Sequence, residues 1–163
     1  MKPRRFKGLL ATLFTYLLIC FFAPQSNATA AADDSFNEEE IRARVLNLPS
    51  QVIKPRYTPA VRSYLRTYTV HNRDKSELIL GKSILYFDLF EATMRQFGLP
   101  EDLKYLSVVE SALNPKAVSR AGAVGLWQFM PATGKEYGLD INYHCDDRCN
   151  PEKSTEAAAQ YLL

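Results

Sequence analysis

The positions of four prolines constrain the fold of this chain more than any other sequence feature. Pro59, Pro100, Pro131 and Pro151 are each expected to open a helix, because the fixed φ of proline suits the first helical turn. The sequence shows no internal repeat and no pair of alternating runs typical of paired strands. We therefore expect an all-α fold.

The apolar residues between the prolines recur at helical spacing and predict which helix faces are buried. A helix opening at Asp74 or Ser76 and ending at Gly98 has the broadest predicted apolar face, formed by Leu78, Leu80, Ile84, Leu85, Phe87, Leu89, Phe90 and Met94. The helix after Pro100 is expected to bury Leu103, Leu106, Val108 and Val109. A short helix is expected from Ser35 or Asn37 to about Leu46, and residues 112–130 are expected to form a loop with short helical pieces.

The N-terminus resembles an export signal. Basic residues precede an apolar run over residues 8–23, and the small residues Ala28-Thr29-Ala30 follow it. We expect a signal peptide over residues 1–30 and a protein exported to the periplasm or cell envelope. A retained membrane anchor is the alternative, although the run is shorter than the roughly 20 residues of a spanning helix. Lipidation at Cys20 is disfavoured because bulky residues precede it.

The net charge of +2 depends on this leader. Four of the 20 basic residues lie in its first seven positions, so the remainder carries 16 basic against 18 acidic side chains. A mildly acidic chain is not expected to bind nucleic acid. The composition, with 7 Gly, 9 Pro and 3 Cys, also excludes collagen-like and disulfide-scaffold proteins.

Two cysteines, Cys145 and Cys149, lie close together beyond the leader. In an oxidising compartment they are expected either to form a disulfide that closes a very small loop or to stay as thiols. A zinc site is disfavoured because no second ligand cluster accompanies His144. We expect no metal, nucleotide or flavin cofactor.

Glu110 lies near the end of an apolar helical run over residues 105–113. The helix dipole disfavours negative charge at that end, and apolar neighbours penalise ionisation, so both effects raise the expected pKa of the carboxyl. A carboxyl that stays protonated near neutral pH can act as a general acid. On this pattern alone, a solvent-facing glutamate at a helix end is the commoner interpretation.

The segment from Ser119 to Pro131 combines small residues with side chains that suit a carbohydrate. Its glycines allow close approach of the backbone to a ligand. Trp127 offers a flat apolar face, and Gln128 can donate to and accept from hydroxyl or acetamido groups. A tryptophan followed by Phe129 and Met130 is more often part of a core, so both interpretations stay open.

The run ESALNP at 110–115, followed by GAVGLWQFMPAT at 122–133, resembles the SLT-type lytic murein transglycosylases, which have a goose-lysozyme-like fold. The resemblance covers about half of the chain and is greatest to the membrane-bound D branch of that family. It implies cleavage of the β-1,4 bond between N-acetylmuramic acid and N-acetylglucosamine in peptidoglycan, with formation of a 1,6-anhydro ring. It also implies peptidoglycan glycan strands as the partner and association with the membrane.

The same resemblance implies roles for individual residues. Glu110 matches the single catalytic acid and base, which suffices without a second carboxylate when the substrate's acetamido group assists. Ser119 matches a serine that steers the sugar, and Gln128 and Met130 match positions lining saccharide subsites. Ser111 matches the residue after the glutamate and is expected mainly to make local hydrogen bonds. Trp127 stands where many relatives have methionine, and either stacks on sugar or packs.

The resemblance also predicts the domain organisation. We expect a signal peptide over 1–30, a helical extension over 31–78 and an SLT-type domain over 79–163. The last helix runs to Leu163 without a cap, and the family's later Tyr-Asn motif does not occur, so we expect a chain truncated at its C-terminus. Activity of this polypeptide alone is therefore in doubt.

Two other functions remain open. One is a hydrolytic lysozyme of the same fold, which would add water instead of forming the anhydro ring. The other is a non-catalytic fragment that only holds peptidoglycan.

Overall fold

The helices before the main core begin at caps that the sequence already marks. The computed structural model describes residues 36–50 and 52–163, so the predicted signal peptide and Cys20 lie outside the described residues. Helix α2 (Glu38–Leu46) begins after Asn37, whose side chain accepts a hydrogen bond from the Glu40 N–H. Helix α3 (Pro59–Arg66) begins after Thr58, whose hydroxyl accepts from the Val61 N–H. Both predicted starts are confirmed.

Helix α3 continues through a π-helical turn, η1 (Thr67–His71), to the long helix α4 (Arg73–Gln96). The start of α4 precedes the two predicted starts, Asp74 and Ser76, because the Ser76 hydroxyl donates to the Tyr68 and Asn72 carbonyl oxygens instead of capping a helix. The predicted end is confirmed, since Gly98 has a φ of 67°. The expected domain boundary at 78/79 falls inside α4 and stays a prediction.

The predicted apolar face of α4 is only partly buried. Phe90 and Met94 are fully buried, and Phe87 and Leu89 pack partly against the core. The prediction is wrong for four residues that remain 60–81% exposed, Leu78, Leu80, Ile84 and Leu85. The two fully buried residues of α4, Phe90 and Met94, lie toward its C-terminal end. In the first half of the helix Ile79, and not these four residues, packs partly against the core, so the core side of the helix there differs from the predicted face.

The region after Pro100 starts as the 3-10 helix η2 (Glu101–Lys104) and continues as α5 (Tyr105–Ser111). Leu103, Leu106 and Val108 pack against the core as predicted, whereas Val109 is 45% exposed and that prediction is wrong. The short α5 ends in two left-handed residues, Ala112 (φ 50°) and Leu113 (φ 56°), which turn the chain so that Leu113 is completely buried.

Residues 112–130 contain no helix, so the predicted helical pieces are wrong. Positive φ values at Gly122, Gly125 and Gln128 interrupt the backbone, and isolated bridges join Val124 to Val118 and to Phe129. Helix α6 (Pro131–Glu136) then begins at a proline, as predicted, and is followed by Gly138 (φ 83°). The 3-10 helix η3 (Asp147–Cys149) precedes α7 (Pro151–Leu162), which Asn150 caps.

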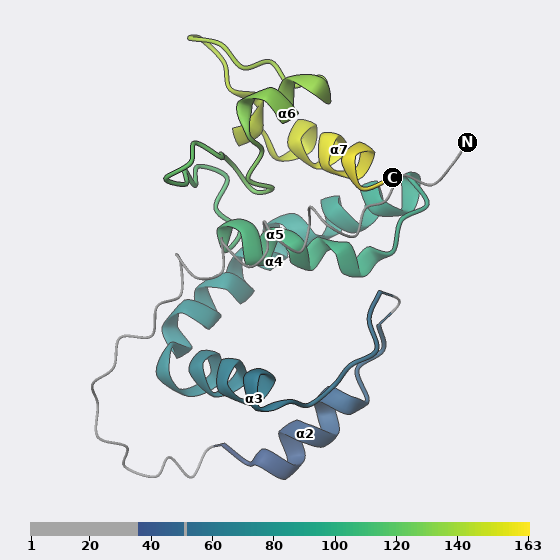
Figure 1. Ribbon diagram of the computed structural model, residues 1–163, viewed down its shortest axis with the longest axis vertical. Helices are drawn as coiled ribbons and strands as arrows, with labels where there is room; N and C mark the ends of the chain where they lie inside the picture. The colour runs from purple at the N-terminus through teal and green to yellow at the C-terminus, as the bar shows by residue number, and fades with distance from the viewer. Residues whose placement is uncertain (1–35, 51) are drawn as a thin grey trace. The chain divides into compact units, whose positions relative to one another are not determined.

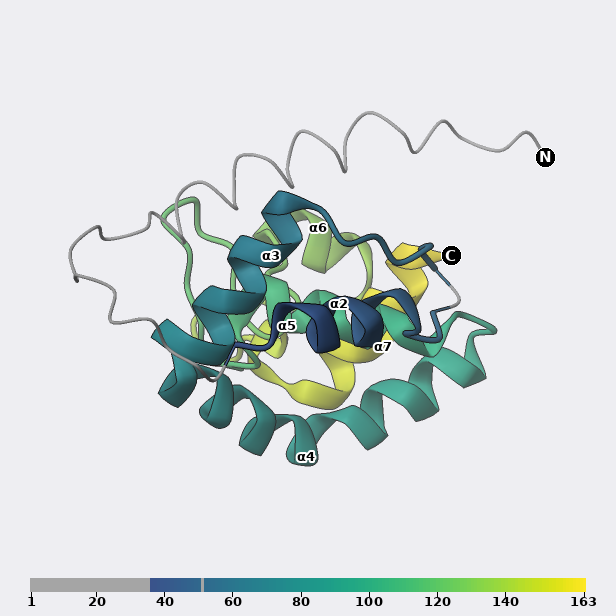
Figure 2. The same cartoon turned by 90° about the horizontal axis from the view of Figure 1, so that it is seen from below.

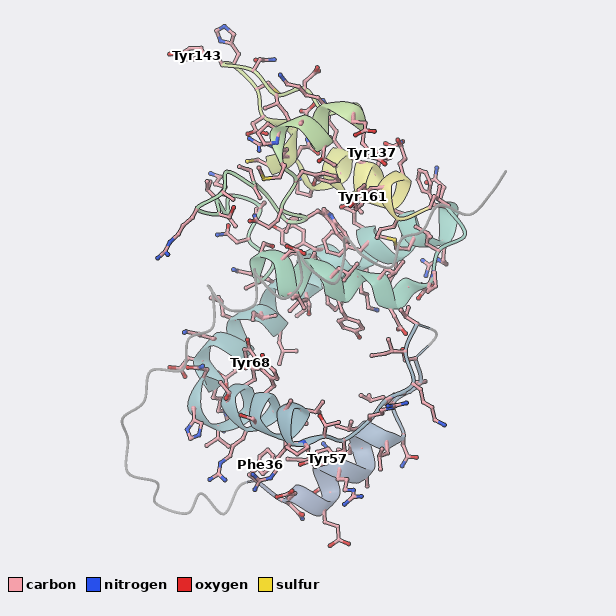
Figure 3. All side chains as sticks on the ribbon, viewed as in Figure 1. Phe36, Tyr57, Tyr68, Tyr137, Tyr143 and Tyr161 are labelled. Atoms are coloured by element: carbon pink, nitrogen blue, oxygen red, sulfur yellow. The ribbon has the colours of Figure 1, made fainter. Side chains whose placement is uncertain are left out.

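The core joins α4, α7 and the loop between α5 and α6. Figures 1 and 2 both place α7 beside α4. The fully or nearly buried core residues are Phe90, Met94, Leu113, Leu126, Trp127, Phe129, Leu139, Ala157, Ala158 and Ala159. Figure 3 shows Tyr137 and Tyr161 near one another at this core, where their rings pack edge to face with centroids 5.4 Å apart.

The all-α expectation is confirmed: residues 36–50 and 52–163 form helices and loops without a β-strand. These residues belong to one unit of the chain, Asp34–Leu163. Among the helices that the structure describes, none combines the length and apolar character needed to cross a membrane.

Candidate active site

Glu110 lies in the last turn of α5 and is half-buried. Burial raises the pKa of its carboxyl above the ordinary value for glutamate, and no neighbouring charge contributes to the shift. The direction agrees with the sequence prediction, and loss of hydration is its cause. Such a carboxyl retains its proton at a higher pH than an exposed glutamate, as a general acid requires.

Polar contacts hold the end of α5 in place beside Glu110. The Ser111 hydroxyl oxygen lies 3.0 Å from the carbonyl oxygens of both Ser107 and Leu126, so it ties α5 to the loop that follows. The Lys82 ammonium on α4 donates to the Ala112 carbonyl oxygen at 3.3 Å. A cation at the C-terminal end of a helix complements the helix dipole. Lys82 was not predicted from the sequence, because its partner is 30 residues away.

Residues 117–130, which we call the site loop, carry two of the predicted substrate-binding residues. The Ser119 hydroxyl accepts from the Ala123 N–H at 3.0 Å, which leaves the hydroxyl proton available to a ligand. The Gln128 amide nitrogen donates to the carbonyl oxygens of Gly125 and Ala117 at 2.9 and 3.2 Å. Both donors of Gln128 are therefore used within the loop, and its Oε1 remains as an acceptor.

The other two predicted residues of this segment differ in exposure. Met130 is 40% exposed at the start of α6, where its thioether side chain can reach a ligand. Trp127 is only 9% exposed: its ring lies 5.0 Å from the ring of Phe90, and its N–H donates to the Thr155 hydroxyl at 3.0 Å. Of the two roles that the sequence left open, the position of Trp127 supports packing and not stacking on a sugar ring.

A buried arginine, missed at the sequence level, holds the site loop from the other side. Arg148 on η3 is 6% exposed, and its Nη1 donates to the Gly122 and Phe129 carbonyl oxygens at 3.0 and 3.1 Å. Its Nε and Nη2 donate to the two carboxylate oxygens of Asp146 at 2.9 and 2.7 Å. This bidentate contact lowers the pKa of Asp146.

Cys145 precedes η3, Cys149 is the last residue of η3, and both are present as thiols. The Cys145 thiol donates to Asp147, and Asp147 accepts from the Lys153 ammonium at 2.9 Å. The hydrogen bond from Lys153 is the main cause that lowers the pKa of Asp147. The described residues contain no group of three or more His, Cys, Asp or Glu side chains that could hold a metal ion. The disulfide stays a prediction.

The structure therefore brings some of the predicted site residues into contact and leaves others apart. Ser111 contacts the site loop directly, and the loop carries Ser119 and Gln128. Arg148 joins the cysteine segment to the site loop by two hydrogen bonds. Within the described part of the chain, the carboxylate of Glu110 has no hydrogen bond to any of these side chains, which leaves it available to an incoming group.

Comparisons with known proteins agree with this arrangement. Residues 88–163, which contain Glu110 and the site loop, match the transglycosylase SLT domain. The chain is 42% identical over 69 residues to membrane-bound lytic murein transglycosylase D of Escherichia coli, a match covering 42% of this chain and 15% of that protein. It is 38% identical over 79 residues to peptidoglycan transglycosylase gp16 of Escherichia phage T7, covering 47% of this chain and 6% of that protein.

These shares mean that the chain spans only a small part of the length of either relative. The matched residues include the end of α4, all of α5, the site loop and α7. Residues 88–163, slightly less than half of the chain, are therefore similar to the transglycosylase SLT domain.

Proposed function

We propose that this protein is a peptidoglycan lytic transglycosylase that cleaves the β-1,4 bond between N-acetylmuramic acid and N-acetylglucosamine and forms a 1,6-anhydro product. The observation that carries the proposal is the half-buried carboxyl of Glu110, with its raised pKa, inside the residues that match the SLT domain. The names of two relatives, a lytic murein transglycosylase and a peptidoglycan transglycosylase, support the same substrate.

The proposed reaction uses Glu110 twice. Its protonated carboxyl donates the proton to the glycosidic oxygen, and the bond from the sugar C1 to that oxygen breaks. The acetamido group of the substrate stabilises the positive charge at C1. The Glu110 carboxylate then takes the proton from the C6 hydroxyl, whose oxygen bonds to C1 and closes the anhydro ring. General acid and base catalysis of this kind contributes about 100- to 10,000-fold in rate.

The site loop supplies the proposed sugar contacts. The Ser119 hydroxyl proton can donate to a sugar oxygen, because its own oxygen is already an acceptor within the loop. Gln128 can accept through Oε1, since both of its amide protons are used in the loop. Met130 can contact an apolar face of the glycan through its exposed side chain.

The domain organisation and location follow as parts of the same proposal. Residues 1–30 are an export signal, residues 31–78 a helical extension and residues 79–163 a transglycosylase domain. The protein then acts in the periplasm or cell envelope, in association with the membrane, as the name of the E. coli relative supports.

Mass spectrometry of the products released from purified sacculi tests the proposal. Muropeptides ending in anhydro-muramic acid, lighter by one water than the hydrolysed form, are the expected product. Hydrated products would replace the proposal with a lysozyme of the same fold. Binding to sacculi without any release would replace it with a non-catalytic peptidoglycan-binding protein.

A further inference from the structure

The proposed reaction makes no use of Arg148, although this arginine is the most extensively hydrogen-bonded side chain near the site loop. Its guanidinium makes four hydrogen bonds, two to main-chain carbonyls of the site loop and two to Asp146. Burying a guanidinium is costly unless its donors are satisfied, and here only Asp146 supplies a counter-charge. The remaining donors are directed to the site loop.

The two loop carbonyls mark the ends of one turn. Gly122 and Phe129 flank the residues that include Gly125 and Gln128, and a single nitrogen of Arg148 bridges their oxygens. The main chain of Arg148 also contacts this turn: a Cβ added to Gly125 would lie 1.8 Å from the Arg148 carbonyl oxygen. Arg148 therefore meets the turn through both its side chain and its backbone.

The site loop is thus held from two sides. On one side Ser111, next to Glu110, contacts the Leu126 carbonyl oxygen. On the other side Arg148 holds the carbonyls of Gly122 and Phe129. The backbone that carries Ser119 and Gln128 is therefore attached both at Ser111, next to Glu110, and at Arg148.

We infer that Arg148 is a positioning residue for the proposed reaction: it holds the site loop at the distance from Glu110 at which a bound glycan meets the acid. The inference rests on the proposed function. Lysine does not serve in this place, because one ammonium cannot donate to two loop carbonyls and bind a carboxylate in a bidentate manner. Arg148 touches neither substrate nor reacting atoms.

Steady-state kinetics of Arg148→Ala on soluble glycan strands test the inference. A displaced site loop raises KM, and we expect an increase of about 10-fold, since small displacements of binding groups have large effects. A smaller folded fraction would instead lower the apparent kcat and leave KM unchanged. Millimolar guanidinium should restore KM in Arg148→Ala by refilling the site, whereas methylammonium should not.

Arg148→Lys is the matched control for charge. We expect its KM to stay close to that of Arg148→Ala, because the charge beside Asp146 is kept and the bridge between Gly122 and Phe129 is lost. An unchanged KM in Arg148→Ala, or full recovery in Arg148→Lys, would overturn the inference. If Arg148→Ala does not fold, Asp146→Asn replaces it as the test variant. This substitution loosens the guanidinium and leaves its bonds to both loop carbonyls, so the inference then predicts a rise in KM of less than about 10-fold.

Hydrogen exchange separates this inference from the proposed function. The amides of Val124 and Phe129 bond to each other's carbonyls across the turn. In Arg148→Ala or Asp146→Asn they should exchange faster, while amides inside α7 should not. Equal changes in both places would show that Arg148 only stabilises the fold. If the wild-type protein releases no products, the proposed function fails, and the exchange data still decide whether Arg148 holds the loop.

Discussion

The region from Phe36 to Asn72 and the region from Arg73 to Leu163 are both helical, but they differ in what holds their helices. In the first region α2, α3 and η1 contain no fully buried residue. Their ordering relies on caps and on exposed ion pairs, such as Glu40 with Arg44 at 2.9 Å. In the second region ten core residues pack together. Exposed ion pairs typically contribute 0 to about 1 kcal/mol, far less than a packed core.

The difference shows why the candidate site lies where it does. A half-buried carboxyl and a loop of irregular backbone need a surrounding framework that holds them in place. Leu113, just before the site loop, and Leu126 and Phe129, within it, are buried and anchor its backbone in the core. The first region offers no such anchor, so its contribution to the site is expected to be small.

Replacing Trp127 should show the largest difference in stability between the two regions. Trp127→Ala removes the contact with Phe90 and the partner of Thr155, so we expect a loss of about 3–5 kcal/mol in the free energy of unfolding. Leu46→Ala, at a 49% exposed position in α2, should cost less than about 1 kcal/mol. Urea denaturation measures both, and equal losses would remove the distinction between the regions.

Gly125→Ala should have the next largest effect. Its φ of 88° is unfavourable for alanine, and the new Cβ would overlap the Arg148 carbonyl oxygen, so we expect a loss well above about 2 kcal/mol. Gly122→Ala is the matched control, with a φ of 87° in the same loop and no atom near its Cβ. Thermal unfolding measures both variants. Equal melting temperatures for Gly125→Ala and Gly122→Ala would show that the contact with Arg148 does not matter for stability.

The stability of the second region should fall in acid through Asp146 and Asp147. Hydrogen bonds from Arg148 and Lys153, respectively, lower the pKa of each carboxyl in the folded state. Their stabilising contribution is therefore complete above the ordinary pKa of aspartate and is lost as the pH falls through the lowered values. The difference in melting temperature between wild type and Asp146→Asn should shrink with falling pH. A constant difference down to strong acid would contradict this account.

The smallest effect is expected from the ion pair of α2. Glu40→Gln removes the charge that faces Arg44, and both side chains are well exposed. We expect a change of about 0.3–0.5 kcal/mol that disappears in high salt. Chemical denaturation at low and high ionic strength measures it. A change as large as that of Trp127→Ala would mean that the first region depends on ion pairs far more than exposed pairs allow.

The helix starts could be predicted from the sequence because their causes are local. Asn37 and Thr58 cap the helix that immediately follows each of them. The exposed half of α4 could not be predicted, because apolar spacing defines a face without indicating which part of it a distant helix covers. Ile84 and Phe90 look alike in the sequence, yet one is 81% exposed and the other is fully buried.

The candidate site divides in the same way. Glu110 could be singled out because an apolar run that ends near a carboxylate predicts a raised pKa, and burial raises its pKa in the structure. The burial itself could not be predicted from that pattern, because a solvent-facing glutamate is its commoner interpretation. Trp127 could not be assigned, since packing on Phe90 and bonding to Thr155 depend on contacts across the fold. The partners of Arg148 lie 19 and 26 residues away in the chain, so no local pattern indicates its role.

The most direct test of the central claim compares wild type with Glu110→Gln in the release of anhydro-muropeptides from purified sacculi. The glutamine has nearly the same shape as the glutamate but cannot act as a general acid or base. Because ionisation of the half-buried carboxyl is unfavourable, we expect the variant to be at least as stable as the wild type at neutral pH. We predict that its melting temperature and its binding to sacculi are retained while release falls at least about 100-fold. Release at the wild-type rate by the folded variant would contradict the assignment of Glu110 as the acid and base.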